Sequence, residues 1–406
     1  MAEKDEPQGH GPPQRSARLV LVLPDGALVG CLPPVAVSTP WWQDAAPVVA
    51  AARERFGLDI LVLRLLETER DRPQGGAVTY LAETARPVKA ELWNRALPPH
   101  PLRQIFAEPG GPARLLQWAS HALASQGIKI SGPPEQFRTW NLSSIWRIST
   151  DHQTVWLKSV PPFFAHEGPL LSFLQGQPVP RILAHQKGNT LLADIAGEDM
   201  HEAGQPALNK MVTLLVDIQA GFPNRTGELL KLGLPDWRAP SLTALIEDVF
   251  SRTRRDLDPA DLSILDHFVA RLPARFSELA DCGLPDTLVH GDFHPGNLRG
   301  SQDAFTLLDW GDSGIGHPLL DQPAFLEHRS LEERSVIKEH WREEWRKHHP
   351  DADLDRAARL LAPVAAARQA VVYRKFLDNI EPSEQVYHQF DPATWLGRAA
   401  NILRGE

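Results

Sequence analysis

Hydrophobic positions at the start of the chain come in short runs that are separated by turn residues. Leu19 to Leu23 is an apolar run, and the Pro24-Asp25-Gly26 stretch after it has the composition of a tight turn. Ala27 to Leu32 then fits a returning strand. This pattern predicts an antiparallel hairpin.

A helical period follows the hairpin. Between Gln43 and Phe56 apolar residues recur near one face, and Gly57 is placed to end the helix. Asp59 to Leu66 and Thr79 to Ala82 then have the composition of strands. Together these segments predict a small α+β unit.

The pattern changes after a second helical stretch from Arg114 to Gln126, which Gly127 is placed to stop. Ile145 to Ile148 and Thr154 to Val160 flank a polar turn and predict another hairpin. The remainder is mostly helical in pattern, apart from a turn-rich stretch from Leu288 to Asp321. We predict three regions: an N-terminal domain over 18–128, a β-rich lobe over 129–196 and a helical lobe over 197–406.

The composition is that of a folded protein with a polar tail. Of the 406 residues, 42% are hydrophobic and 23% are charged, which allows buried cores in more than one domain. Residues 1–17 are rich in Gly, Pro and charge and lack the apolar segment of a secretory signal, so they predict a disordered tail. Cys31 and Cys282 form no disulfide or zinc motif, which indicates a reducing compartment.

Charge and hydropathy limit the partners. A net charge of −9 disfavours nucleic acid, because binding to a phosphate backbone requires a basic surface. No stretch reaches the ~18 uninterrupted apolar residues that cross a bilayer, since even Leu58 to Leu66 contains Asp59 and Arg64. We expect a soluble, cytoplasmic protein without a nucleic-acid or membrane partner. The oligomeric state stays open.

Two neighbouring motifs carry chemistry. The run HGDFHPGN spans residues 290–297, and LLDWG spans 307–311. Phosphoryl transfer needs a carboxylate that accepts the proton of the attacking hydroxyl, and oxygen ligands that hold Mg²⁺ against the phosphates. Asp292 suits the first role. Asn297 follows it at the spacing of the protein-kinase catalytic loop, and Asp309 ends an apolar run as a metal-binding Asp does.

Both motifs resemble those of the aminoglycoside phosphotransferase and choline-kinase-like family. The resemblance implies an α+β, bilobal protein-kinase-like fold with a small β-rich lobe and a larger helical lobe. It also implies an ATP-dependent kinase that uses Mg²⁺ and transfers the γ-phosphate to a hydroxyl of a small molecule, a metabolite or an antibiotic such as an aminoglycoside. Asp292 would be the catalytic base, and Asn297 and Asp309 would hold the metal.

Each of these positions also has an ordinary structural interpretation. Asp292 alone fits a turn or capping residue, and the spacing of the motif favours chemistry. His290 and His294 stand four residues apart, as metal ligands do, but the resemblance assigns them to support of the loop. Asp312 fits a turn carboxylate, and Asp321 is expected to fix the start of the next helix.

An ATP site also needs a cation on the phosphates and an acidic partner for that cation. Lys158 ends the alternating run Val155 to Lys158, which suits the inner face of a strand. The resemblance implies that Lys158 binds the phosphates and that Glu167, at the start of the next helix, pairs with it. The alternatives are a solvent-exposed strand lysine and an acidic residue that complements a helix dipole.

Further nucleotide-binding candidates come from the resemblance. Thr190 to Gly197 resembles the hinge of the family, which implies that Asp194 and Ala196 lie beside the base of the nucleotide. The segment WNLSSI, where a phosphate loop is expected, lacks a G-x-G-x-x-G pattern. Ser143 and Ser144 in this segment are candidate phosphate donors, with a turn role as the equal alternative.

The N-terminal unit, Arg18 to Ala85, resembles a Nudix domain in its order of hairpin, helix and strand. Nudix hydrolysis needs several helix glutamates that bind Mg²⁺. Glu54 fits one of them, but Ala51 and Arg55 stand at two other carboxylate positions. We expect a non-catalytic, Nudix-like domain that packs on the kinase or caps its substrate cleft.

Two other functions stay open at this stage. One is a kinase that acts on Ser or Thr of a peptide, and the other is a catalytically inactive nucleotide-binding scaffold. The choice between ATP and GTP is also open. Carboxylates in the C-terminal helices would suit a cationic acceptor, with solvated helix faces as the alternative. These carboxylates are Glu327, Asp378, Glu381 and Glu384.

Overall fold

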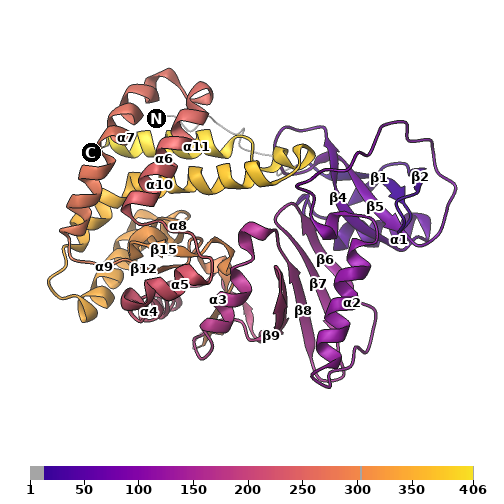
Figure 1. The fold of residues 1–406 in the computed structure, drawn as a ribbon, viewed down its shortest axis with the longest axis horizontal. Coiled ribbons are helices and arrows are strands. Elements are labelled where there is room, and N and C mark those ends of the chain that lie inside the picture. Colours follow the sequence, from indigo (N-terminus) through magenta and orange to yellow (C-terminus); the bar gives the residue numbers. More distant parts are fainter. Residues whose placement is uncertain (1–12, 302–303, 406) are drawn as a thin grey trace. The chain divides into compact units, whose positions relative to one another are not determined.

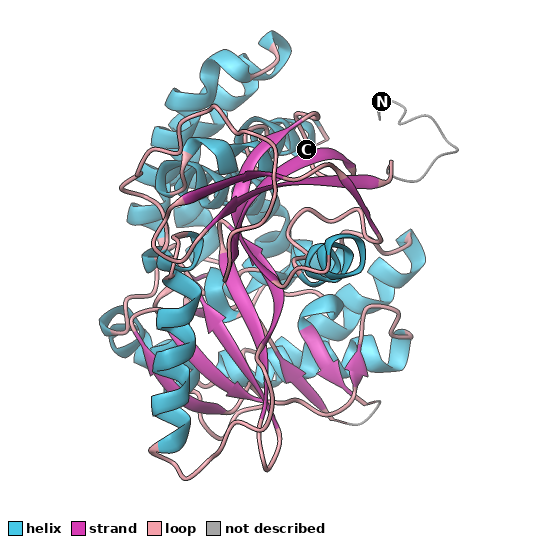
Figure 2. Ribbon diagram, turned by 90° about the vertical axis from the view of Figure 1, so that its right-hand side faces the viewer, coloured by secondary structure: helices cyan, strands magenta, loops and turns pink. Residues whose placement is uncertain are grey.

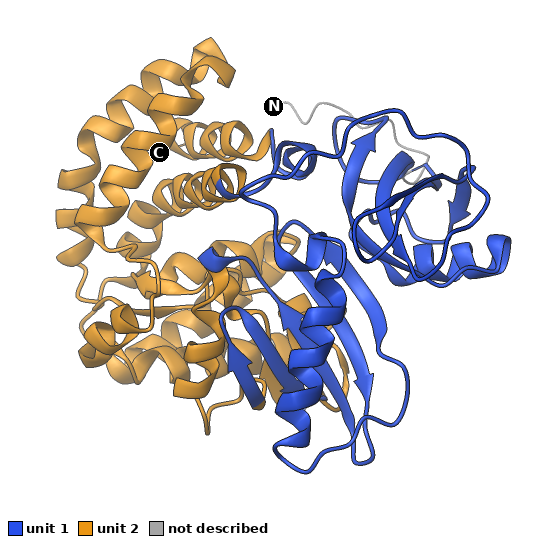
Figure 3. Ribbon diagram, turned by 45° about the vertical axis from the view of Figure 1, so that its right-hand side comes forward, with its two compact units in different colours: residues 1–163, 183–194, 379–389 blue, residues 164–182, 195–378, 390–406 orange. Residues whose placement is uncertain are grey.

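The computed structural model describes residues 13–301 and 304–405. The chain divides into two compact units, each made of sequence-distant segments (Figure 3). Unit 1 contains the residues up to 163, 183–194 and 379–389. Unit 2 contains 164–182, 195–378 and 390–406. The domain limits predicted from the sequence, near 128 and 196, stay predictions.

The first sheet of unit 1 has the strand order β2-β1-β5-β4, with β3 also paired to β1 (Figure 1). Its strands are β1 (Arg15–Val22), β2 (Leu28–Cys31), β3 (Val35–Val37), β4 (Ile60–Thr68) and β5 (Gly76–Thr84). β1 runs parallel to β5 and antiparallel to β2. The predicted hairpin is therefore confirmed.

Both faces of β1 are buried, which explains its continuous apolar run. Leu19 and Leu21 belong to one core, which includes Val48 of helix α1 (Ala46–Phe56). Val20 and Val22 belong to a second core on the other face. The first sheet is thus the middle layer of its part of unit 1.

The strand begins earlier than the composition suggests. Arg15 to Ala17, which we assigned to the tail, form the start of β1, whereas the tail residues 1–12 lie outside the described part. The buried Arg15 guanidinium donates to Tyr80 Oη at 3.1 Å and to Thr39 Oγ1 at 3.1 Å. A charged residue at a buried strand end made this stretch resemble a polar tail.

The second sheet of unit 1 has the order β6-β7-β8-β10-β9 and is drawn with the other strands in magenta in Figure 2. Its strands are β6 (Glu135–Trp140), β7 (Ser143–Ser149), β8 (Thr154–Ser159), β9 (Ile182–Gln186) and β10 (Asn189–Ala193). Ile148 lies opposite Val155, so the second hairpin is confirmed as well. Helix α2 (Gly111–Ala124) packs Leu115 and Leu123 into the core of this sheet.

Side chains from two distant segments complete the edge of β4. Gln136 of β6 accepts from the Val62 N–H at 2.8 Å and donates to the Val62 carbonyl at 2.7 Å. Glu384, in the short helix η8 (Pro382–Tyr387), accepts from the Leu65 N–H at 2.8 Å. The C-terminal segment 379–389 is therefore built into unit 1.

Unit 2 is mostly helical, as the pattern predicted. Its helices are α3 (Glu167–Phe173), α4 (Gln205–Ala220), α5 (Thr226–Lys231), α6 (Ala239–Thr253), α7 (Pro259–Ala280), α8 (Gln322–Leu326), α9 (Leu331–His348), α10 (Leu354–Asn379) and α11 (Asp391–Arg404). Across the described residues, the longest apolar helices fall short of what a membrane crossing requires.

Two small sheets lie in the turn-rich stretch of unit 2. β11 (Glu198–Asp199), β13 (Leu298–Gly300) and β14 (Phe305–Leu307) form one of them. β12 (Thr287–Val289) pairs with β15 (Gly314–Gly316) in the other. The motif at 290–297 follows β12, and the motif at 307–311 begins at the end of β14. Each strand therefore positions the start of one motif.

Candidate active site

The loop after β12 places Asp292 and Asn297 in contact. The Asn297 side-chain amide donates from Nδ2 to the Asp292 carbonyl oxygen at 2.9 Å and to Asp292 Oδ2 at 3.1 Å. This arrangement orients the carboxylate and leaves Asn297 Oδ1 for another ligand. The Asp292 side chain is 42% exposed, so a substrate hydroxyl can reach it.

His294 sets the charge state of Asp292. Its Nδ1 accepts from the Gly296 N–H at 3.1 Å, and its Nε2 lies 3.6 Å from Asp292 Oδ2. Burial opposes ionisation of Asp292, but the interaction with His294 outweighs burial and holds the pKa of Asp292 below its usual value. Asp292 is therefore ionised near neutral pH and is a hydrogen-bond acceptor.

His290 supports the loop from inside. Its Nε2–H donates to the Leu308 carbonyl at 2.8 Å, and its Nδ1 accepts from the Asp292 N–H at 3.3 Å. Burial lowers the pKa of His290 to about 4, which keeps the ring neutral. Because both ring nitrogens are engaged by backbone groups, the arrangement favours structural support over metal ligation.

Gly291 lies where a side chain would not fit. Its φ is +90°, and an added Cβ would lie 1.9 Å from the Asp312 carbonyl oxygen. Close passage of this backbone beside Asp312 explains why a glycine precedes Asp292.

Asp321 has a different role from the one we predicted. It directly precedes α8, but its side chain makes no cap bond to that helix. Asp321 instead accepts from the His290 N–H at 2.9 Å and from the Gly291 N–H at 2.6 Å, with a third donor in Gln219 at 2.9 Å. The prediction that Asp321 fixes the start of α8 is wrong, because buried N–H groups of the Asp292 loop take its oxygens.

Arg368 is a site residue that the sequence did not reveal. It comes from α10 and is 1% exposed. Its guanidinium donates to the Gly291 carbonyl at 3.0 Å and to the Asp312 carbonyl at 3.2 Å, and it stacks 3.6 Å from the ring centre of Trp237. Its one signal in the sequence is a lone cation within a helix stretch of Ala and Val.

Asp309 follows β14 in a backbone conformation that is uncommon outside glycine. Its φ is +58°, in the left-handed region, which concentrates at functional sites. The Leu308 N–H donates to the Asn297 carbonyl at 2.7 Å and thereby links the two motifs. Just after Asp309, the Trp310 N–H donates to Glu167 Oε1 at 3.2 Å.

Negative charge accumulates where the two motifs meet. Burial, together with the charges of Asp292 and Asp309, raises the pKa of Asp312 to about 7. Asp292, Asn297 and Asp309 are thus brought together within unit 2, as the sequence predicted for its phosphoryl-transfer residues. Their individual roles stay predictions.

The expected nucleotide residues divide between the units. Lys158 lies on β8, opposite Ile145 of β7 and Thr190 of β10, in unit 1. Glu167 lies in unit 2, so the predicted pairing of Lys158 with Glu167 stays a prediction. Ala196 also belongs to unit 2.

The other candidates in unit 1 have local hydrogen-bond partners. Ser144 Oγ accepts from Trp146 Nε1 at 2.9 Å, and Ser143 Oγ accepts from Trp140 Nε1 at 3.1 Å. Both serines are buried at the start of β7, and their role as phosphate donors stays a prediction. Asp194 Oδ1 accepts from Trp156 Nε1 at 2.7 Å.

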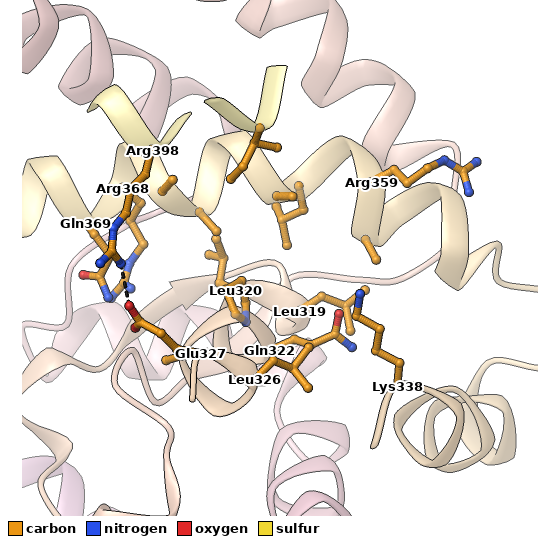
Figure 4. Close-up of a pocket in the computed structure, with 18 of the residues that line it drawn as sticks. Leu319, Leu320, Gln322, Leu326, Glu327, Lys338, Arg359, Arg368, Gln369 and Arg398 are labelled. Atoms are coloured by element: carbon orange, nitrogen blue, oxygen red, sulfur yellow. Dashed lines mark hydrogen bonds and ion pairs between the residues drawn. The ribbon is translucent and has the colours of Figure 1, made fainter. Parts of the chain in front are cut away.

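A cavity opens beside Asp292 within unit 2. Its volume is about 780 Å³, and it is lined by residues of α8, α9, α10 and α11 (Figure 4). A volume of roughly 300 to 1,000 Å³ is typical of small-molecule sites. The carboxylate of Asp292 therefore borders a space that is large enough for a small acceptor.

The β-rich N-terminal part and the helical C-terminal part define the class of fold as bilobal and protein-kinase-like. Solved structures with a similar fold include a macrolide 2'-phosphotransferase type I, at 16% identity and a TM-score of 0.51, over 69% of this chain and 96% of that one. The choline kinase LicA from Streptococcus pneumoniae gives 14% identity and a TM-score of 0.49, over 72% of this chain and 100% of that one. The likeness to the macrolide phosphotransferase, together with the β-rich and helical parts of this chain, confirms the predicted fold class.

The family follows from the sequence match. A model of the phosphotransferase enzyme family matches residues 137–357, more than half of the chain. The chain belongs to this family and is a phosphotransferase that acts on an alcohol group. A search among curated proteins gave no match. Because the family match begins at residue 137, the Nudix-like resemblance of the N-terminal domain stays a prediction.

Proposed function

We propose that this phosphotransferase moves the γ-phosphoryl group of ATP to a hydroxyl of a small molecule, with Mg²⁺ as cofactor. The observation that carries the proposal is the position of the Asp292 carboxylate. This carboxylate is held by Asn297 and His294 and borders a cavity of about 780 Å³. Asp292 accepts the proton of the acceptor hydroxyl while the oxygen attacks the phosphorus.

The residues around Asp292 fit a magnesium ion. Mg²⁺ prefers oxygen ligands and is commonly held by one or two protein groups together with phosphates and water. Asn297 offers Oδ1, because its Nδ2 is used by Asp292, and Asp309 offers a carboxylate. The charges of Asp292 and Asp309 add to burial in raising the pKa of Asp312, and a bound cation would offset those charges. Bound there, Mg²⁺ would neutralise charge on the phosphates.

Other residues of this chain hold these groups still. Arg368 donates to the Gly291 carbonyl, Asp321 accepts from the Gly291 N–H, and Glu167 accepts from the backbone directly after Asp309. Such support keeps the base and the metal ligands in place without reorganisation during the reaction. Lys158 on β8 would supply the cation for the phosphates.

Replacement of Asp292 by Asn tests the proposal. The full-length protein would be incubated with Mg·ATP and a panel of small alcohols, and ADP release and phosphorylated products would be measured by mass spectrometry. We expect Asp292→Asn to lower the transfer rate about 10²- to 10⁴-fold, because a general base is lost. Binding of Mg·ATP should be retained.

The matched control is Asp351→Asn, an exposed carboxylate between α9 and α10 that does not line the cavity. It should transfer phosphate at the rate of the unchanged protein. The proposal would be wrong if Asp292→Asn kept the full rate, or if the unchanged protein failed to bind Mg·ATP.

A further inference from the structure

The cavity beside Asp292 has an apolar centre. Leu319, Leu320 and Leu326 lie in its middle in Figure 4, and α10 and α11 contribute Leu361, Trp395 and further apolar side chains. Apolar lining with a few placed polar groups is the usual composition of a small-molecule site. The body of a bound acceptor is therefore expected to be apolar.

The charged side chains of the cavity are mostly basic. Among its described lining residues, three are acidic: Asp292, Glu327 and Asp355. Six are basic: Arg334, Lys338, Arg342, Arg359, Arg368 and Arg398. The chain as a whole carries a net charge of −9, so the sign of the charge is reversed at this cavity. A local reversal of this kind raises the local concentration of anions.

Two of the three acidic residues are already neutralised. Glu327 Oε1 accepts from Arg398 at 2.5 Å, and Asp355 Oδ1 accepts from Arg342 at 2.5 Å. The third, Asp292, is the proposed base. A polycationic acceptor would therefore meet no unpaired carboxylate among the described lining residues other than the base itself.

The other carboxylates that we considered for a cationic acceptor are engaged elsewhere. Asp378 binds Arg252 at 2.5 Å. Glu381 binds Arg103 at 2.7 Å and Glu384 accepts from the Leu65 N–H, both within unit 1. Among the described residues, these carboxylates therefore do not form the acidic cleft that an aminoglycoside would require.

Two cations of the cavity have no assigned partner. Neither Lys338 nor Arg359 makes a hydrogen bond or ion pair with another residue in the described part of the chain. In Figure 4 both start at one end of the cavity, where the Lys338 ammonium points toward Leu319 and the exposed Arg359 side chain points outward. Arg368, which binds the Gly291 carbonyl next to Asp292, lies at the other end. The cavity therefore has a catalytic end and a cationic end.

From this layout we infer that the acceptor is an apolar alcohol that carries an anionic group, a carboxylate or a phosphate. The inference rests on the proposed function. The hydroxyl lies at Asp292, the apolar body lies against the leucines, and the anionic group pairs with Lys338 and with Arg359, whose exposed side chain turns inward.

Binding of three matched probes tests the charge preference. The full-length protein without nucleotide would be titrated calorimetrically with 10-hydroxydecanoate, its neutral methyl ester and the cationic 10-aminodecan-1-ol. We expect the hydroxy acid to bind about tenfold more tightly than the ester, the size expected for two partly exposed ion pairs. The amino alcohol should bind more weakly than the ester.

Substitutions test which side chains cause the preference for the hydroxy acid. The double variant Lys338→Gln and Arg359→Gln should bind the hydroxy acid no more tightly than the ester, and its affinity for the ester should change less than about twofold. Arg346→Gln is the matched control, because Arg346 lies on the same helix as Lys338, is 52% exposed and does not line the cavity. This control should keep the full preference.

Several results would overturn the inference. They are equal or tighter binding of the amino alcohol, no binding of any probe, and a preference that survives the double variant or falls equally in the control. Mg·ATP would be titrated into the same preparation. Failure to bind nucleotide with an intact acid preference would count against the proposed function alone, whereas nucleotide binding without an acid preference would count against the acceptor class alone.

Discussion

The peptide that carries Asp292 is held by charged groups on both sides. The His290 and Gly291 N–H groups donate to Asp321, and the Gly291 carbonyl accepts from Arg368. Hydrogen bonds to ionised groups are stronger than neutral ones, about 1.5–3 kcal/mol each. Buried groups therefore determine where the Asp292 carboxylate lies.

Gly291→Ala tests this backbone fit. The new Cβ would lie 1.9 Å from the Asp312 carbonyl oxygen and 2.7 Å from Arg368 Nη2, so the loop has to shift. We expect a stability loss above the ~1–2 kcal/mol that a left-handed alanine costs, together with a large loss of transfer rate. Urea unfolding and the ADP-release assay measure the two effects.

Gly57→Ala separates the cost of a left-handed alanine from the cost of the contact with Asp312. Gly57 also has a positive φ, of +63°, but an added Cβ meets no described atom within 4 Å. This variant should lose about 1–2 kcal/mol and keep its activity. Equal stability losses in both variants would show that the contact with Asp312 is unimportant.

At the residue scale, the sequence predicted the residues whose spacing is required by phosphoryl transfer. Asp292, Asn297 and Asp309 were found because phosphoryl transfer requires these residue types close together. Arg368 and Asp321 were missed in their actual roles, since their hydrogen bonds go to backbone groups. Backbone partners leave no complementary residue in the sequence, so such support becomes visible only when the chain is folded.

At the scale of elements, the segment 379–389 is the least expected feature. It follows α10 in sequence, yet its carboxylates satisfy Arg103 and the Leu65 N–H of the N-terminal sheet. Helices and hairpins were predicted from local periodicity and turns. The place of segment 379–389 in the fold could not be predicted in this way, because its contacts span more than 270 residues and depend on long-range packing.

Glu384 makes the stability of this segment dependent on pH. Burial raises the pKa of Glu384 from 4.5 to about 8. Between these values the folded chain holds a proton that the unfolded chain has lost, so stability falls as the pH rises. Glu384→Gln should remove this slope and raise the melting temperature by a few degrees at about pH 8, with little change near about pH 5.

Thermal unfolding across this pH range measures the effect. Glu54→Gln is the control, because Glu54 is an exposed glutamate on α1 in the same unit. Its curve should follow that of the unchanged protein. A parallel pH slope in Glu384→Gln would mean that the carboxyl is not the titrating group.

At the scale of the whole molecule, the chain passes repeatedly between its two units. The bilobal class was predictable from the motifs, because the family that they resemble has that fold. The assignment of 379–389 to unit 1 was not predictable, since a single pair of domain limits cannot describe a unit that is built from three segments.

Fragments test how far the N-terminal sheet depends on later residues. Residues 13–128 lack Gln136, whereas residues 13–140 keep Gln136 and its two hydrogen bonds to Val62. We expect the longer fragment to be more stable by about 2 kcal/mol, at roughly 1 kcal/mol for each hydrogen bond. Urea unfolding would compare them, and equal midpoints would contradict the role of Gln136.

The family match ends at residue 357, near the start of α10, although α10 and α11 supply much of the cavity wall. A chimera that exchanged residues 358–406 would therefore replace much of that wall and keep Asp292, Asn297 and Asp309, but it would lose Arg368, which donates to the Gly291 carbonyl. The same exchange would also replace Glu381 and Glu384. A successful graft would thus need compensating changes at Arg103 and around Leu65, far upstream of the exchanged segment.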